Sequence, residues 1–442
     1  MQKCINPILL FAVFTLFPVI AKSSTDTDNA DHFKNLLRDT GVKVGGWING
    51  GVTYNANNPA NGYNGTVTFA DRTGEPQLNQ FNIFFQRTVV TEGKAFDIGG
   101  RFDFMFGTDA IYTQAFGIPA SDVNTGLPLH RGNWDLNICC KSTRTYGIAL
   151  PQAYLEAYVP VGNGLNIKAG HFYSPTGYET VPAPDNFFYT HAYSFNNGEP
   201  FTHVGVVGNY ATNSNWSVMG GVTTGSATGG WDGTFDKQLG NWGGLGGITW
   251  TSDDKRTSAN ITGTYSKTSV RSNEPWGMYN VVLQHRITSR THLVLHHVHG
   301  YAGGVLLNGR QKNAEWYSIN THLYYDLLND LSVGIRTEWF RDRDGFRVPS
   351  PFRVAAAVDS TGSSFAGNFG TVTSAPADYY EVTLGMNWKP AKRLRIDWKP
   401  MQKLNIRSNI RYDRANGLHQ TYRPFDNRKD QFLFSVDATI PF

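Results

Sequence analysis

Residues 432–442 read Phe-Leu-Phe-Ser-Val-Asp-Ala-Thr-Ile-Pro-Phe, and they end the chain. Every second residue from Phe432 to Phe442 is apolar, and most of the residues between them are small or polar. Such alternation is typical of a β-strand with one apolar and one polar face. A strand at the end of a chain needs a partner, and in a closed barrel the first strand can be that partner. A terminal amphipathic strand that ends in Phe is typical of bacterial outer-membrane β-barrels.

The composition of the chain favours one large barrel. Of 442 residues, 17% are charged and 14% are aromatic, and 47 are glycine. This mixture is too apolar for a disordered chain and too rich in glycine for a helix bundle. After the first two dozen residues, no apolar run approaches the ~20 residues that a membrane helix needs.

The first 21 residues predict a secretion signal. Lys3 provides a positive start, residues 8–20 are apolar, and Val19-Ile20-Ala21 ends the segment as a cleavage site with small residues. The segment contains one of the 39 basic residues and none of the 35 acidic ones, so cleavage leaves 38 against 35. A net charge of +3 predicts no nucleic-acid partner. We expect residues 22–41 to form a short periplasmic segment and residues 42–442 to form the barrel.

Alternation and turn residues predict sixteen strands in an all-β, antiparallel transmembrane barrel. They lie at residues 42–54, 79–90, 96–107, 146–159, 164–173, 202–211, 215–224, 242–251, 256–267, 276–287, 291–301, 314–326, 331–340, 379–389, 402–413 and 430–442. Short connections, such as 212–214, alternate with long ones, such as 108–145 and 302–313. This asymmetry is typical of outer-membrane barrels, which have short periplasmic turns and long extracellular loops. With an even number of strands, we expect both termini on the periplasmic side.

The same alternation separates a lipid-facing set from a lumen-facing set. The predicted lipid face includes Val382, Leu384, Leu404 and Ile410, while Glu381 and other polar residues point inward. A charged interior cannot pack dry, and sixteen strands are about wide enough to enclose an aqueous channel. The alternative is a network of charge pairs that only braces the wall. The predicted pore wall consists of Arg101, Asp103, Glu156, Lys168, Arg286, Arg336, Glu338, Arg407 and Arg411.

The connection at residues 174–200 is the most distinctive predicted loop. It contains four prolines and several aromatic residues, and it has acidic residues but no Lys or Arg. Proline limits the conformations of a loop, and a long ordered loop is usually functional. We therefore predict that this loop folds into the barrel and narrows it. The predicted constriction residues are Glu179, Asp185, His191 and Glu199.

Several runs of sequence resemble a known family. They are Leu150–Tyr158 (LPQAYLEAY), Lys168–Phe172 (KAGHF), Gly177–Glu179 (GYE), Ala183–Phe188 (APDNFF) and Glu199–Gly205 (EPFTHVG). These runs are similar to the "putative β-barrel porin, OmpL-like" family, and the similarity extends from Gly46-Trp47-Ile48 to the terminal strand. The resemblance implies an outer-membrane pore without naming a solute. One departure is that Trp388-Lys389-Pro390 recurs as Trp398-Lys399-Pro400, as after a small tandem duplication.

The loop and the wall together predict a porin. We expect passive diffusion of small hydrophilic solutes, with the acidic loop facing basic wall residues. Basic and acidic residues are nearly balanced on the predicted wall, so we expect weak ion selectivity. The expected partners are outer-membrane lipid, lipopolysaccharide, the solutes and, as in many porins, two further copies in a homotrimer. We expect no cofactor, no metal ion and no catalytic residues, and a location in the outer membrane of a Gram-negative bacterium.

Other chemistry remains as an alternative. Cys139 and Cys140 are the only cysteines after the signal, and in an oxidising compartment they predict a vicinal disulfide or a bond to another chain. His297 and His299 lie on one face of a predicted strand, and His292 and His296 lie on the other; a pair two residues apart on a strand can hold a metal ion. A barrel hydrolase would need a nucleophile beside an oriented histidine. The histidines considered for that role are His171, His191 and His203, near Ser174, Ser194, Asp185 and Glu199. The last alternative is a non-conducting barrel whose loops bind a partner at the cell surface.

Overall fold

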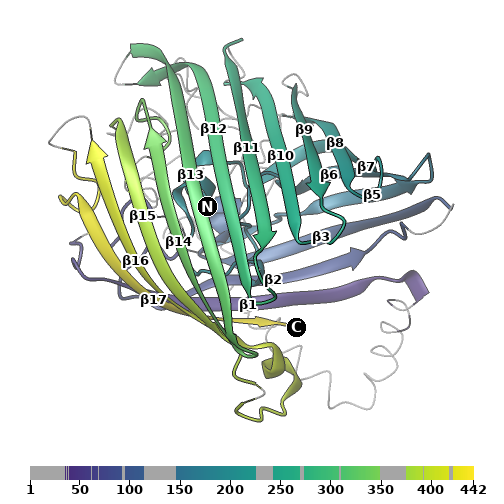
Figure 1. Ribbon diagram of the computed structural model, residues 1–442, viewed down its shortest axis with the longest axis horizontal. Helices are drawn as coiled ribbons and strands as arrows, with labels where there is room; N and C mark the ends of the chain where they lie inside the picture. Colours follow the sequence, from purple (N-terminus) through teal and green to yellow (C-terminus); the bar gives the residue numbers. More distant parts are fainter. Residues whose placement is uncertain are drawn as a thin grey trace, which may run out of the picture.

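The chain forms a closed antiparallel β-barrel of sixteen strands (Figure 1). This computed structural model describes residues 35, 37, 39–60, 62–67, 69–91, 95–113, 146–224, 242–268, 273–307, 310–348, 375–391, 393–417 and 422–442. Each strand pairs with its neighbour in the sequence, and β1 (Lys43–Asn55) pairs with β17 (Asp430–Pro441) to close the wall. The predicted terminal strand therefore has the first strand as its partner, and the predicted fold is confirmed.

The strands between these two follow the order of the chain. They are β2 (Gln77–Arg87), β3 (Asp97–Gly107), β4 (Gly147–Ala149), β5 (Ala153–Val159), β6 (Leu165–Tyr173), β7 (Thr202–Ala211), β8 (Trp216–Thr224), β9 (Trp242–Thr251), β10 (Thr257–Lys267), β11 (Pro275–Arg286), β12 (Thr291–Leu307), β13 (Arg310–Leu328), β14 (Leu331–Asp342), β15 (Ala377–Trp388) and β16 (Asn405–Gly417). The short helical segments are α3 (Ala110–Thr113), η1 (Ala183–Asp185), η2 (Ser194–Gly198) and η3 (Lys399–Lys403). No helix among the described residues is long and apolar enough to cross a membrane.

Strands β4 and β5 are two pieces of one wall strand. Both pair with β3, and the break between them falls at Leu150-Pro151-Gln152. Proline has no backbone N–H to donate to a strand ladder, so the pairing is interrupted there. The seventeen strands of the sheet therefore form sixteen wall strands, and β4 and β5 together correspond to the single strand predicted at residues 146–159.

The wall has its apolar face outward and its polar face inward. On β15, Val382 and Leu384 are 41% and 51% exposed, while Glu381 and Thr383 are 1% and 0% exposed. This arrangement is the reverse of that in a soluble protein, and it is the one expected of a barrel with lipid outside and polar groups inside. The predicted alternation of faces on this strand is therefore confirmed.

Two predicted connections differ from the structure. The predicted loop at 302–313 is mostly strand, because β12 continues to Leu307 and β13 begins at Arg310. A register shift after Ala302 lets the ladder resume at Val305, so Gly303 and Gly304 lie at a bulge within the strand. Figure 1 shows the tips of β12 and β13 side by side at this end of the barrel.

The connection between β15 and β16 is the second difference. Strand β16 begins at Asn405, three residues later than predicted, because η3 occupies the end of the duplicated segment. Leu404 therefore precedes the strand and is buried, and its predicted lipid-facing position is wrong. Figure 1 shows this connection projecting at the end opposite the tips of β12 and β13.

Candidate functional site

The connection between β6 and β7, residues 174–201, lies inside the barrel and is called the inner loop below. Every residue from Phe188 to Pro200 is buried, and hydrogen bonds join the loop to side chains of β2 and β13–β16. The helical segments η1 and η2 shape it, and Pro182 and Pro184 fix the backbone around η1. The inner loop is therefore attached mainly to one side of the wall.

Three wall arginines hold the backbone of the inner loop. Nη1 of Arg407 donates to the carbonyl oxygens of Ala183 and Asn186 at 2.8 Å each and to that of Phe188 at 3.3 Å. Arg411 donates to the carbonyl of His191, and Arg336 donates to that of Thr190 at 2.7 Å. Hydrogen bonds from charged donors are the stronger ones, roughly 1.5–3 kcal/mol each.

Each of these arginines is also paired with a carboxylate of the wall. Nε of Arg407 lies 2.9 Å from Oδ1 of Asp437, on the neighbouring strand β17. Arg411 pairs with Asp413 of the same strand, and Arg336 pairs with Glu381 of β15. The three guanidinium groups are buried, and a buried charge needs such a partner. The wall therefore supplies charge balance, and the loop supplies carbonyl acceptors.

Acceptors on the wall bind the loop's N–H groups in turn. The carboxylate of Glu338 accepts the N–H groups of Tyr193 and Ser194, the latter at 2.7 Å. The amide oxygen of Asn409 accepts the N–H of Tyr189 at 2.7 Å. Buried backbone groups without partners are costly, and these bonds satisfy them at the turn into η2.

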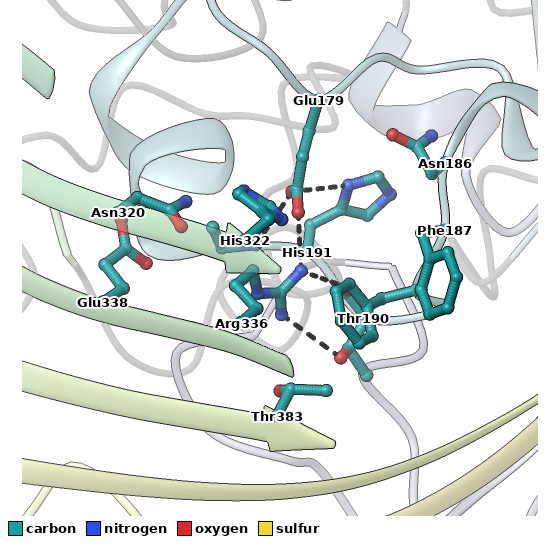
Figure 2. A network of polar contacts seen from close by, with 12 residues as sticks. Glu179, Asn186, Phe187, Thr190, His191, Asn320, His322, Arg336, Glu338 and Thr383 are labelled. Carbon is teal, nitrogen blue, oxygen red and sulfur yellow. Dashed lines mark hydrogen bonds and ion pairs between the residues drawn. The ribbon is translucent and has the colours of Figure 1, made fainter. Parts of the chain in front are cut away.

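Glu179 lies at the centre of the polar network in Figure 2. Its Oε1 is 2.6 Å from Nη1 of Arg336, and its Oε2 is 3.1 Å from Nδ1 of His191. Burial raises the pKa of Glu179, but the adjacent Arg336 and His191 outweigh it and hold the pKa well below its ordinary value. Burial also lowers the pKa of His191 below its ordinary value. Glu179 therefore stays ionised and joins the start of the loop to the wall.

Glu199 makes the second acidic contact of the inner loop. Its Oε1 lies 2.9 Å from Nε2 of His296 on β12, so a carboxylate does contact one of the alternating histidines. Gly177 packs against the same carboxylate, because a Cβ at this position would lie 1.6 Å from Oε2 of Glu199. Its φ of +86° also favours glycine.

Aromatic rings join the inner loop to the first long loop. The rings of Phe195 and Phe201 stack with centroids 4.4 Å apart, and Phe195 stacks on His191 at 4.2 Å. Phe69, between β1 and β2, packs 5.7 Å from Phe201 and is 1% exposed. This second inward segment was not predicted, because the residues around Phe69 show no periodicity that would distinguish the segment from a solvent-exposed loop.

The other predicted pore-wall residues lie outside these anchors. Arg101 pairs with the buried Asp103, and Lys168 lies 4.3 Å over the ring of Tyr154. Glu156 accepts a hydrogen bond from Asn166, and Arg286 is exposed at the rim. Asp185 is exposed on the inner loop, between Ala183 and Asn186, whose carbonyl groups accept hydrogen bonds from Arg407. The role of all these residues as a pore lining remains a prediction.

The catalytic and metal-binding alternatives find partial geometry. Oγ of Ser174 lies 2.9 Å from Nε2 of His203, but no carboxylate among the described residues is hydrogen-bonded or ion-paired to His203. A nucleophilic serine needs a histidine that a third group orients. In the part of the chain that the structure describes, no three His, Cys, Asp or Glu residues cluster as metal ligands. The predicted signal and the Cys139-Cys140 pair lie outside the described residues.

Comparisons with known proteins place this geometry in context. A family model described as "Putative beta-barrel porin-2, OmpL-like" matches residues 41–442. The comparison with curated proteins gives no match. Similar solved structures include OprB of Pseudomonas putida, at 11% identity and a TM-score of 0.53 over 94% of this chain and 97% of that one.

Two further structures have similar values. The outer-membrane channel DcaP of Acinetobacter baumannii is 10% identical, with a TM-score of 0.51 over 91% of this chain and 97% of that one. An anion-selective porin from Comamonas acidovorans is 10% identical, with a TM-score of 0.51 over 91% and 99%. At such low identity these likenesses show the fold alone.

Proposed function

Because the chain belongs to the OmpL-like family of β-barrel porins, we propose that it forms a water-filled channel for passive diffusion of small hydrophilic solutes across the outer membrane. The observation that carries this proposal is the inner loop, which lies inside a closed barrel and is held by Arg336, Arg407 and Arg411. A loop fixed within a barrel sets the width of the lumen that remains. Glu179, His191 and Glu199 help to fix the loop, and Asp185 lies on its exposed part.

The proposed channel is weakly ion-selective. Arg336, Arg407 and Arg411 each pair with a carboxylate on the same or the neighbouring strand, so these charges largely cancel locally on the wall. Arg101 is likewise paired with Asp103. One similar structure is that of an anion-selective porin, but its 10% identity carries no detail of its lining to this chain.

We also propose a homotrimer with both termini on the periplasmic side. One of the similar structures, OmpT of Vibrio cholerae, is described as a trimer form, with 10% identity and a TM-score of 0.50 over 91% of this chain and 99% of that one. The short connections, such as 212–215 between β7 and β8, lie at one rim, and in outer-membrane barrels that rim is periplasmic. Cross-linking in detergent and protease access in intact cells test these two statements.

The direct test of the channel is single-channel conductance of refolded mature protein in a planar bilayer with a salt gradient. The proposal expects stable current steps and a small reversal potential. A variant without residues 178–198 should conduct more, because it lacks the segment that fills the lumen. Equal conductance in the deletion variant would place the narrowest part of the channel elsewhere. No steps from protein that shows β-rich circular dichroism would contradict the channel and favour a surface barrel that binds a partner.

The hydrolase alternative has one specific observation in its favour, the contact between Ser174 and His203. A Ser174→Ala variant tests it on lipid and peptide substrates. We expect no activity above background in either protein, because no carboxylate orients the histidine in the described structure.

A further inference from the structure

A cavity of about 430 Å³ lies at the rim of the barrel where the short turns gather, and we call it the vestibule. Its walls come from the ends of β11–β16 and from the part of the inner loop around η1. Cavities that bind small molecules usually have volumes of this order. Its lining includes Arg286, Arg290, Lys389, Asp185, Phe187 and Tyr324.

The basic residues of the vestibule differ from the arginine anchors. Arg286, Arg290 and Lys389 are exposed, and within the described residues none of them has a carboxylate at ion-pair distance. The two acids that line the cavity are Asp185 and Asp326, and Asp326 accepts a hydrogen bond from Ser332 at 2.6 Å. Three cations without a partner thus face two carboxylates, so the cavity has an excess of positive charge. Such a cavity attracts anions.

Aromatic rings line the inner side of the vestibule. The centroids of Phe187 and Tyr324 are 4.6 Å apart, and Tyr178 lines the cavity next to them. The carbonyl of Phe187 accepts a hydrogen bond from Asn387 at 2.9 Å, which holds the backbone of Phe187 against the wall, and its ring packs on Phe188 and Tyr324. Figure 2 shows Phe187 at the edge of the network around Glu179 and Arg336. A fixed apolar ring surface favours a flat ring in the ligand.

We propose that the vestibule binds small organic anions with an aromatic ring, such as aromatic carboxylates, at the short-turn mouth. The carboxylate of the ligand lies among Arg286, Arg290 and Lys389, and its ring packs on Phe187 and Tyr324. This proposal rests on the proposed channel, because a ligand bound here would lie in the path of solutes. It adds a local binding site to a pore that remains weakly selective overall.

The test uses benzoate as the probe in single-channel recordings of the full mature protein. Benzoate added at one face should interrupt the current in a concentration-dependent way, and addition at the other face should have a weaker effect. Benzamide tests the charge, because it keeps the ring and has no carboxylate. Cyclohexanecarboxylate tests the ring, because it keeps the charge and has no aromatic face. Equal interruption by all three compounds, or by none, would overturn the proposal.

Matched variants distinguish binding in the vestibule from a general effect of surface charge at the rim. Lys389→Met and Arg290→Met should each weaken the effect of benzoate by up to about fivefold, the upper end for an exposed charge pair. Arg393→Met is the control, because Arg393 lies on the same connection as Lys389 but pairs with Asp330 and does not line the cavity. An equal loss in the control would show that net charge at the rim is responsible, and the proposed site would then be wrong.

A binding measurement keeps this inference separate from the channel proposal. Saturation-transfer NMR of benzoate with detergent-solubilised protein does not require conduction. Transfer that is weaker in Lys389→Met but unchanged in Arg393→Met supports the site even if no current steps are seen, in which case the channel proposal alone fails. Current steps without benzoate binding would leave the channel intact and refute the site.

Discussion

Replacing Arg407 with methionine should release part of the inner loop without opening the wall. Arg407 is 2% exposed, and one of its nitrogens serves the carbonyl groups of Ala183, Asn186 and Phe188. Methionine keeps much of the volume and donates no hydrogen bond. Three loop carbonyl groups would then lose their common donor, so we expect the loop to leave the wall around η1.

The size of the effect follows from these contacts. The two bonds at 2.8 Å are well formed, and at the lower end of roughly 1.5–3 kcal/mol each they contribute about 3 kcal/mol to loop docking. Since about 1.4 kcal/mol is a factor of ten, the undocked population should rise about 100-fold. The variant also leaves Asp437 as a buried charge with a lost partner, which costs roughly 3–5 kcal/mol of stability. A second variant, Arg407→Met with Asp437→Asn, removes that penalty and keeps the loss at the loop.

The assay combines single-channel current noise with thermal unfolding. Both Arg407 variants should show more frequent current fluctuations than the unmodified protein, while the double variant should unfold at a higher temperature than the single one. Arg101→Met is the matched control. Arg101 also pairs with a wall carboxylate, Asp103, but no described hydrogen bond joins it to the inner loop. The control should lose stability without a change in current noise.

Two results would contradict the proposed role of Arg407 in holding the inner loop. Current noise that is unchanged in both Arg407 variants would mean that the carbonyl contacts do not hold the loop. Equal noise in Arg101→Met would mean that any loss of a wall ion pair disturbs the lumen, whether or not the residue touches the loop.

Three further predictions test other parts of the structure. Gly177→Ala should destabilise the docked loop by about 1–3 kcal/mol, because the added Cβ meets Glu199. Gly62 also has a positive φ but has open space around it, so Gly62→Ala should lower the stability less in the same thermal unfolding assay. Val382→Arg should cost about 2–4 kcal/mol in refolding titrations into lipid vesicles, with Val382→Leu unchanged, because this residue faces lipid on β15. The pKa of Glu179 in the folded protein is held below its ordinary value of 4.5. The stabilisation of the docked loop by ionised Glu179 is therefore fully present above pH 4.5 and is lost as the pH falls through the lowered pKa. Current noise should rise on acidification, and it should rise less in Glu179→Gln.

The barrel could be predicted from the sequence because a strand between lipid and water has period two. Every second residue faces lipid and is apolar, so the alternation alone assigns Val382 and Glu381 to opposite faces, without information on the neighbouring strands. Leu404 is a residue for which periodicity gave the wrong face. It has the right period and residue type, but the 3₁₀ turn before it delays the strand by three residues. Periodicity predicts faces well inside a strand and poorly at its ends.

The arrangement inside the barrel could not be predicted in the same way. The sequence identified Arg407 as lumen-facing, but its partners Ala183 and Asp437 are 224 and 30 residues away. Backbone carbonyl groups are the same in every residue, so no sequence pattern shows which of them an arginine binds. The inward position of Phe69 was missed for a related reason, since a single apolar residue in an irregular loop has no period to read.

The pairing of the wall arginines suggests the order in which the interior forms. Arg336 of β14 pairs with Glu381 of the adjacent strand β15, diagonally across the ladder, and Arg407 of β16 lies directly opposite Asp437 of β17, so both pairs can form as soon as those strands meet. The inner loop then adds carbonyl acceptors to all three guanidinium groups, whose charge is already balanced by the wall, and one further carboxylate, that of Glu179, to Arg336. A barrel without the loop keeps that balance, and water in the widened lumen can accept the freed N–H donors. We therefore expect the variant without residues 178–198 to fold into a stable barrel, and failure of that variant to refold would mean that the loop takes part in closing the wall.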